Sequence, residues 1–387
     1  MAQEQVVLGN ERLTAAWSDL GLGPRGGLIT NHSGVDGGLV ATADRLAAAS
    51  GIDLVCLFGP EHGIRGDVAD GAAVAGGTDQ RTGVPVHSLY GPARQPDSTV
   101  LADLDALLFD IQDVGARFYT YLYTMSLSMA ACAEQGVPFI VLDRPNPIGG
   151  VEIEGPVLEP AFASFVGLYP IPIRHGMSMG EAARFFNEAC GIGAELIVVE
   201  MQGWQRAGYW EQTGLSWVAP SPNMPTVDTA VVYPGLCLCE GTNLSEGRGT
   251  ARPFEQVGAP FVDGARLADR LNELTLPGVR FRPVYFQPTA SKYAGQVCQG
   301  VQLHVLERTV FRPVRAGLEL LAAVKAMWPD DFAWRVPQTG IYNFDKLAGT
   351  DQIRRQLDAG VAAEEVLDGC GQAVARFAQT RDQYLIY

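Results

Sequence analysis

Short apolar runs alternate with helical stretches along the first 150 residues. A continuous apolar run such as 53–58 is typical of a parallel strand that is covered on both faces of its sheet. Because strands that alternate with helices pair in parallel through right-handed crossovers, the pattern predicts an open α/β sheet. The predicted strands are 27–30, 53–58, 84–89, 106–109 and 137–142, and the predicted helices between them are 41–49 and 119–135.

The rest of the chain predicts a smaller α+β unit. Proline and glycine become frequent after residue 150, so we expect a Rossmann-like domain over 1–155 and an α+β domain with long active-site loops over 156–387. A helix at 180–190 and a strand at 196–199 allow the first domain to extend to about residue 230. Segment 219–252 is expected to be irregular, and so long a loop is usually functional. Further helices are expected at 265–274 and 315–327, and strands at 279–285 and 301–305.

The composition narrows the class of protein. A chain of 387 residues, 47% apolar and 18% charged, is ordinary for a globular protein and long enough for two domains. Its formal net charge of −15 disfavours nucleic acid and anionic membrane surfaces as partners. No apolar run has the length of a membrane span and no export signal is visible. We therefore expect a cytoplasmic protein, or an exported one if a leader precedes this sequence.

The cysteines predict reduced, buried thiols. They number seven, an odd count, and lie in apolar runs, unlike the disulfide framework of a secreted protein. Cys237 and Cys239 alternate with leucine, as on one face of a strand, and no second pair lies nearby to complete a metal site. The glycine fingerprint at 21–26 precedes the first strand, where it cannot hold a dinucleotide. We therefore expect neither a metal nor a cofactor.

Polar side chains follow four of the predicted strands. The carboxyl ends of parallel strands meet at one edge of a sheet, and ligands bind there. Loops are polar in most proteins, so each motif alone is weak evidence, but the four together predict a ligand site. The motifs are Thr-Asn-His at 30–32, Pro-Glu-His-Gly at 60–63, Asp-Ile-Gln-Asp at 110–113 and Asp-Arg-Pro-Asn at 143–146.

Two carboxylates favour glycoside cleavage. Glu61 follows a fully apolar strand, where a low dielectric favours the protonated form that a general acid needs. Glu246 lies near Arg248 in a glycine-rich loop, where the cation favours the ionised form. Carboxyl groups held in different charge states are a recurring feature of glycosidases. The alternative is structural, with Glu61 capping a helix and Glu246 in a loop ion pair.

Other chemistries remain open. Residues 176–180 match the nucleophile-elbow pattern Gly-x-Ser-x-Gly, so a serine esterase or amidase would use Ser178 with His175. Ser178 and Glu181 also form a capping box at the start of a helix, which we favour. A third alternative is a sugar-binding module without turnover. A metal hydrolase would use His32, His62, His175, Asp110 and Asp113, but their spacing is not that of a metal site.

Seven segments together make the chain resemble a bacterial family that was long a domain of unknown function and is now represented by exo-β-N-acetylmuramidases. The resemblance runs from about residue 5 to the C-terminus. It implies a Rossmann-like domain packed on a smaller domain, with the active site in the cleft between them. The segments are 29–34, 58–66, 109–121, 142–147, 175–178, 220–225 and 240–250.

The implied activity is removal of terminal N-acetylmuramic acid from the non-reducing ends of peptidoglycan fragments. In the family, the glutamate of the Pro-Glu-His-Gly motif is the favoured catalytic residue. Here it is Glu61, and we take Glu246 as the second catalytic residue. The sugar carries a lactyl carboxylate, which arginine binds in a bidentate manner. The expected substrate-binding residues are Asn31, His32, His62, Arg65, Asp110, Gln112, Asp113, Arg117, Tyr119, Arg144, Asn146, His175, Asn223, Asn243 and Arg248.

Overall fold

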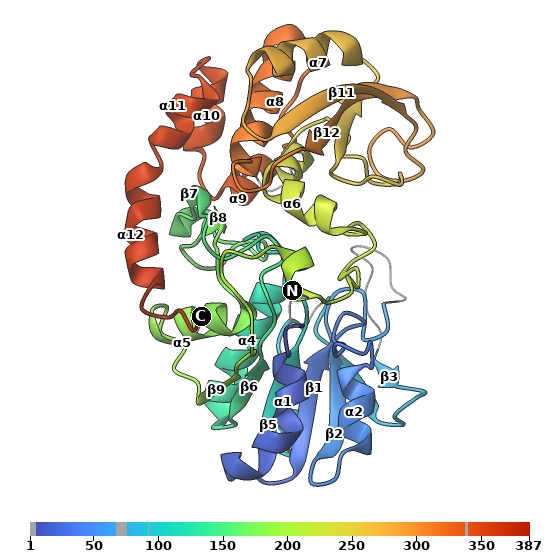
Figure 1. The fold of residues 1–387 in the computed structure, drawn as a ribbon, viewed down its shortest axis with the longest axis vertical. Coiled ribbons are helices and arrows are strands. Elements are labelled where there is room, and N and C mark those ends of the chain that lie inside the picture. Colours follow the sequence, from blue (N-terminus) through green and yellow to red (C-terminus); the bar gives the residue numbers. More distant parts are fainter. Residues whose placement is uncertain (1–4, 67–75, 92, 337–339) are drawn as a thin grey trace.

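The computed structural model describes residues 5–66, 76–91, 93–336 and 340–387, and the chain forms two halves (Figure 1). The N-terminal half is built on a seven-stranded sheet in the order β3-β4-β2-β1-β5-β6-β9. Its neighbours pair in parallel, except that β3 and β4 are antiparallel. The strands are β1 (Arg25–Thr30), β2 (Asp53–Gly59), β3 (Gly77–Thr78), β4 (Pro85–Ser88), β5 (Ala106–Asp110), β6 (Phe139–Leu142) and β9 (Leu196–Val199).

Helices cover both faces of this sheet. Alternate residues of β5 point to opposite faces, so Phe109 packs with α4 and α5, whereas Leu108 packs with α1 and α2. All five residues of β5 are buried, which explains its continuous apolar sequence. The helices of this half are α1 (Gly9–Ala16), α2 (Thr42–Ala48), α3 (Ser98–Leu101), α4 (Tyr121–Gln135) and α5 (Met179–Glu188), with 3₁₀ turns η1 (Trp17–Leu20), η2 (Pro160–Phe162) and η3 (Trp210–Thr213).

The C-terminal half holds a three-stranded antiparallel sheet in the order β10-β12-β11. A two-stranded antiparallel pair, β7 and β8, lies between the halves in Figure 1. The strands are β7 (Glu154–Val157), β8 (Pro172–Arg174), β10 (Gln256–Ala259), β11 (Val279–Phe286) and β12 (Cys298–Val305). The helices are α6 (Val227–Leu236), α7 (Gly264–Glu273), α8 (Pro313–Met327), α9 (Asn343–Ala348), α10 (Gln352–Asp358), α11 (Ala363–Asp368) and α12 (Gly371–Arg381), with the 3₁₀ turn η4 (Cys237–Gly241).

The predicted fold class is confirmed, because a mostly parallel sheet with helices on both faces is joined to a smaller α+β unit. Two expectations were wrong. Segment 219–252 contains α6 and η4, and the alternation of Cys237 and Cys239 with leucine lies in η4 instead of a strand. Helix α6 is buried on all sides, so it lacks the amphipathic period that reveals a surface helix.

A close backbone contact explains how α6 is buried. A Cβ atom on Gly235 would lie 1.8 Å from the Pro313 carbonyl oxygen, and one on Gly317 would lie 2.4 Å from the Gly235 carbonyl oxygen. Glycine therefore allows α6 and α8 to pack with their backbones in contact. This packing fixes the position of η4, which directly follows α6 and begins the segment that carries Glu240 and Glu246.

The chain returns to the N-terminal half at its end. Helix α12 runs along the molecule toward α5, and the C-terminus lies beside α5 (Figure 1). The Ile386 amide donates to Glu181 at 2.9 Å, and the Tyr387 hydroxyl donates to Asp143 at 2.7 Å. Among the described residues, no helix is both long and apolar enough to cross a membrane.

Candidate active site

The ends of β5 and β6 carry a buried ion pair. The Arg144 guanidinium donates from Nε to Asp110 Oδ1 and from Nη2 to Asp110 Oδ2, the latter at 2.9 Å. Asp110 also accepts from Asn10 and Thr42, and both members of the pair are at most 3% exposed. Because these groups bind each other away from solvent, Asp110 and Arg144 are not positioned to bind a sugar. Their contacts support a structural role, and their expected role in substrate binding stays a prediction.

Four other residues of the strand-end motifs bind neighbouring loops. Asn31 donates to the Tyr121 hydroxyl at 2.8 Å, and a ring nitrogen of His32 lies 2.7 Å from the Ala219 carbonyl oxygen. Burial lowers the pKa of His32. The Gln112 amide donates to the carbonyls of Asp113 and Pro145, and that of Asn146 donates to the Met177 carbonyl at 3.0 Å. These side chains hold the loops at the edge of the sheet, because a buried side-chain amide needs a hydrogen-bond partner.

Three further expected residues are also committed to the fold. Arg117 is fully buried and donates to the carbonyl oxygens of Pro156, Ile171 and Leu347 at 2.6–2.8 Å. Burial lowers the pKa of Arg117 to about 10. Arg65 forms ion pairs with Asp44 and Asp79, and Asn243 bonds the backbone of Asp331 and Ala333. A lactyl carboxylate or sugar hydroxyl would have to displace these partners, and the substrate-binding role of Arg65, Arg117 and Asn243 stays a prediction.

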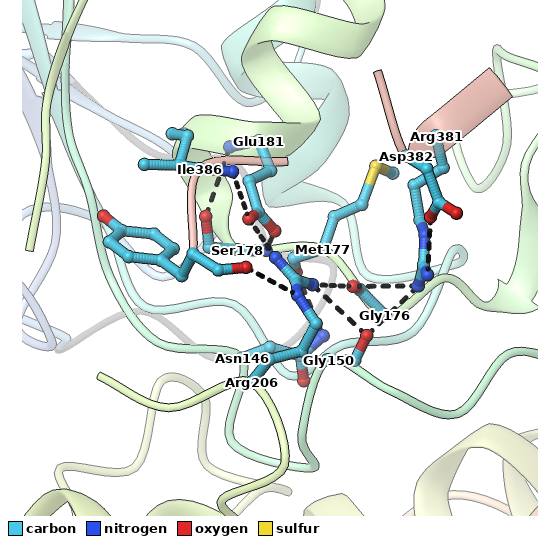
Figure 2. Close-up of polar contacts among 12 residues, drawn as sticks. Asn146, Gly150, Gly176, Met177, Ser178, Glu181, Arg206, Arg381, Asp382 and Ile386 are labelled. Atoms are coloured by element: carbon cyan, nitrogen blue, oxygen red, sulfur yellow. Dashed lines mark hydrogen bonds and ion pairs between the residues drawn. The ribbon is translucent and has the colours of Figure 1, made fainter. Parts of the chain in front are cut away.

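The nucleophile-elbow hypothesis is wrong, because Ser178 has no hydrogen bond to His175. The Ser178 hydroxyl donates to Asp143 at 2.9 Å. It also accepts from the Glu181 amide, while the Glu181 carboxylate accepts from the Ser178 amide (Figure 2). This reciprocal pair is the capping box that the sequence indicates at the start of α5. His175 instead accepts from the Met177 amide through Nδ1, and its Nε2 lies 3.7 Å from Asp113.

Glu61 lies in the turn that follows β2. The Thr120 hydroxyl, just before α4, donates to Glu61 Oε2 at 3.2 Å, and the Glu61 side chain is half-buried. The next residue, His62, is buried and has a φ angle of +73°. A non-glycine residue in this left-handed region costs free energy, and such strain is concentrated at functional sites. The strained turn fixes the direction in which Glu61 leaves the sheet.

Aromatic rings connect Glu61 to the C-terminal half. Tyr119 neighbours Thr120, and its ring centroid lies 5.9 Å from that of Tyr233 in α6. The Tyr233 ring lies 4.7 Å from that of Phe254, and the Arg248 guanidinium lies 5.0 Å from the Phe254 centroid. Tyr119, next to the Thr120 that binds Glu61, and Arg248, two residues from Glu246, therefore contact the same aromatic cluster from the two halves of the molecule.

Glu246 is held by two cations. It is 2% exposed, its Oε2 accepts from Lys292 Nζ at 2.9 Å, and its Oε1 lies 3.5 Å from Arg248 Nε. Lys292 also donates to the carbonyl oxygens of Cys239 and Leu244 at 2.9 and 2.7 Å. Sequence reasoning missed Lys292. Lysine is rare in this chain, and that rarity could have marked Lys292 as a candidate partner of a site carboxylate.

Glu240 is the second carboxylate of this cluster, and sequence reasoning did not assign it a role. Arg248 donates to Glu240 Oε1 from Nε at 3.0 Å and from Nη2 at 2.7 Å. Burial and then the nearby Glu246 carboxylate raise the pKa of Glu240, while Arg248 opposes the rise. The sequence could have indicated Glu240 as a site residue, because it is the first residue of the motif at 240–250.

The structure thus separates the expected site residues into two groups. Tyr119 belongs to the aromatic cluster, the Arg248 guanidinium lies over Phe254, and the Glu246 carbonyl accepts from the Phe254 amide, whereas most of the strand-end residues stabilise loops. Glu61 is joined to this region through Thr120, the residue after Tyr119. Asn223 is half-buried in the segment that precedes α6. Among the described residues, no group of three or more histidine, cysteine, aspartate or glutamate side chains is arranged to hold a metal ion.

The fold is an α/β protein whose two halves each supply glutamates, the residue type that glycoside cleavage uses. Family models for exo-β-N-acetylmuramidase NamZ match both parts of the chain, the N-terminal model over residues 27–228 and the C-terminal model over 231–387. The chain therefore belongs to the exo-β-N-acetylmuramidase family, and the resemblance seen in its motifs is confirmed.

Individual relatives agree with this assignment. The chain is 50% identical over 365 residues to peptidoglycan β-N-acetylmuramidase NamZ of Bacillus subtilis, covering 94% of this chain and 87% of the relative. A crystal structure of a DUF1343 family protein from Bacteroides fragilis is 38% identical with a TM-score of 0.91. A second protein of that family from the same organism is 29% identical with a TM-score of 0.77. Each of the two Bacteroides structures matches over 99% of this chain and 99% of its own chain.

Proposed function

We propose that this chain is a glycoside hydrolase that releases terminal N-acetylmuramic acid from the non-reducing ends of peptidoglycan fragments. The observation that carries the proposal is the 50% identity, over 94% of the chain, to a peptidoglycan β-N-acetylmuramidase. It is supported by the position of Glu61, on a strained turn beside an aromatic cluster where the two halves meet.

Glu61 is the proposed general acid. Its carboxyl group would protonate the glycosidic oxygen as the bond to the anomeric carbon breaks. The Thr120 hydroxyl fixes one carboxyl oxygen, which limits the rotation of the side chain. A second carboxyl group is expected across the sugar ring. Its separation from Glu61 sets the stereochemical course, at about 5 Å for retention and about 6.5–9.5 Å for inversion.

Arg248 is the cation that we propose for the lactyl carboxylate of N-acetylmuramic acid. Of the four arginines expected there, Arg117 and Arg144 are buried, and Arg65 and Arg248 are each paired with two carboxylates. The Arg248 side chain is 25% exposed and lies beside the aromatic cluster. Tyr119, which contacts that cluster, is the proposed surface for the pyranose ring.

A defined disaccharide tests the proposal. N-acetylmuramic acid β-linked to N-acetylglucosamine is incubated with the wild-type protein, and the released sugars are separated by chromatography. We expect free N-acetylmuramic acid, and a loss of at least about 100-fold in kcat for Glu61→Gln, the scale of general acid catalysis. The matched control is Glu134→Gln, an exposed position near the end of α4, with unchanged kcat.

Three outcomes distinguish the alternatives. Saturable binding of the disaccharide without release would identify a muropeptide-binding protein. Release of an acyl group in place of a sugar would identify an esterase or amidase. A folded Glu61→Gln variant with near wild-type kcat would remove Glu61 from the mechanism while leaving the activity intact.

A further inference from the structure

The two glutamates at the start of the loop after α6 differ in what surrounds them. Glu246 is 2% exposed and contacts a different cation through each oxygen, Lys292 through Oε2 and Arg248 through Oε1. If Glu246 turned toward a substrate, the Lys292 ammonium would lose its carboxylate partner in a largely buried position, which is unfavourable. The two cations therefore hold the Glu246 carboxylate in its present orientation.

Glu240 is the more accessible of the two. Its side chain is 28% exposed, compared with 2% for that of Glu246. Arg248 donates two hydrogen bonds to the same oxygen, Oε1, at 3.0 and 2.7 Å. The guanidinium therefore orients the carboxyl group from one side. Burial and the neighbouring Glu246 raise the pKa of Glu240, which makes its carboxylate a stronger base.

Arg248 connects Glu240 to the aromatic cluster, since it donates to Glu240 and its guanidinium lies 5.0 Å from the Phe254 centroid. The Phe254 ring lies 4.7 Å from that of Tyr233, which lies 5.9 Å from that of Tyr119. Tyr119 directly precedes Thr120, which binds Glu61. The partners of the two glutamates, Thr120 and Arg248, thus lie at the two ends of one row of aromatic rings.

We propose that Glu240 is the second carboxyl group of the reaction, and that Glu246 and Lys292 position Arg248 and the loop around it. This inference rests on the proposed function. Glu61 gives its proton to the glycosidic oxygen as the bond between that oxygen and the anomeric carbon breaks. The oxygen of a water molecule bonds to the anomeric carbon, and one proton of that water passes to Glu240. One water is consumed, and proton exchange with solvent restores both carboxyl groups.

The test compares Glu240→Gln with Glu255→Gln on the defined disaccharide. Glu255 is a matched control, because it is a buried carboxylate of the same half that also pairs with an arginine, Arg252. We expect Glu240→Gln to lower kcat by at least about 100-fold with KM changed less than about threefold. Glu255→Gln is expected to keep kcat within about twofold of wild type, since it lies outside the proposed site.

The pH profile separates a catalytic role from a structural one. A base works only when deprotonated, so wild-type kcat falls as the pH decreases through the pKa of the base. Glu240→Gln should lose this acidic limb, and azide should restore turnover to Glu240→Ala by attacking the anomeric carbon without a base. A general loss of activity that keeps the acidic limb and resists azide would overturn the inference.

The remaining outcomes are also decisive. If Glu240→Gln keeps more than about one-tenth of the wild-type kcat while Glu61→Gln is inactive, Glu240 is not the second group although the proposed function stands. If the wild-type protein releases no N-acetylmuramic acid, the proposed function fails and this inference fails with it. Thermal unfolding of each variant identifies any loss that comes from misfolding.

Discussion

Lys292 shows how one side chain determines the geometry of a site it does not itself form. Its ammonium donates three hydrogen bonds, to the carbonyl oxygens of Cys239 in η4 and of Leu244 and to the Glu246 carboxylate. The sequence separation between Lys292 and Glu246 is too large for a motif to reveal the contact. Local patterns predicted Glu246 and Arg248 as site residues, but they did not predict that Lys292 would bury Glu246 or leave Glu240 more exposed.

Replacing Lys292 tests the ion pair. Lys292→Met should lower the free energy of unfolding by about 3 kcal/mol, because it leaves the buried Glu246 carboxylate without its main partner. Urea unfolding gives the value. Lys325→Met is the control, since Lys325 pairs with Asp358 at the surface and should cost less than about 1 kcal/mol. Equal losses for the two variants would contradict the assignment.

Asp143 makes the stability of the protein depend on pH. Burial raises the pKa of Asp143 to about 6 in the folded state, from an ordinary value of 3.8. Between these values the folded state binds more protons than the unfolded state, so stability falls as the pH rises through this range. The change is on the order of 3 kcal/mol.

Asp143→Asn removes this titration. The free energy of unfolding of the variant should therefore change less between pH 4 and pH 7 than that of the wild type. Urea unfolding at the two pH values measures the difference. The same pH dependence in both proteins would show that Asp143 does not titrate there.

Among the elements, regular patterns were predictable and buried irregular ones were not. The predicted strand at 196–199 matches β9, and the expected helix at 315–327 lies within α8. Helix α6 was missed, because apolar residues surround it and Pro234 lies inside it. The domain boundary stays a prediction, and the pairing of β9 with β6 favours its later position near residue 230.

The role of Ser178 as the N-terminal cap of helix α5 can be tested by replacing it. Ser178→Ala removes the cap that accepts from the Glu181 amide and should lower the free energy of unfolding by about 1 kcal/mol. Release of N-acetylmuramic acid should be unchanged, because Ser178 binds Asp143 and the helix terminus instead of a histidine. Loss of turnover in a variant that is otherwise stable would restore the serine-hydrolase hypothesis.

For the whole molecule, the sequence indicated the function by the combination of its motifs, and the fold shows why most of those motif residues serve structure. Asn31, Gln112, Asn146 and Arg117 are polar residues beside the site, so their pattern is that of a binding surface. Most of their partners belong to distant segments, such as the Tyr121 hydroxyl for Asn31 and the Leu347 carbonyl for Arg117, 230 residues away. No short-range pattern distinguishes a polar group that binds substrate from one that binds a loop.

The return of α12 to the N-terminal half affects how the two halves can move. The polypeptide crosses between them once before α6 and again along α12, and Arg117 links them through the Leu347 carbonyl. A rotation about a single linker would have to break the contacts of Arg117 or detach the terminal residues from α5. The distance between the segments that carry Glu61 and Glu240 is thus fixed when the chain folds. A glycan end therefore binds to a preorganised site, and binding requires no closure of one half onto the other.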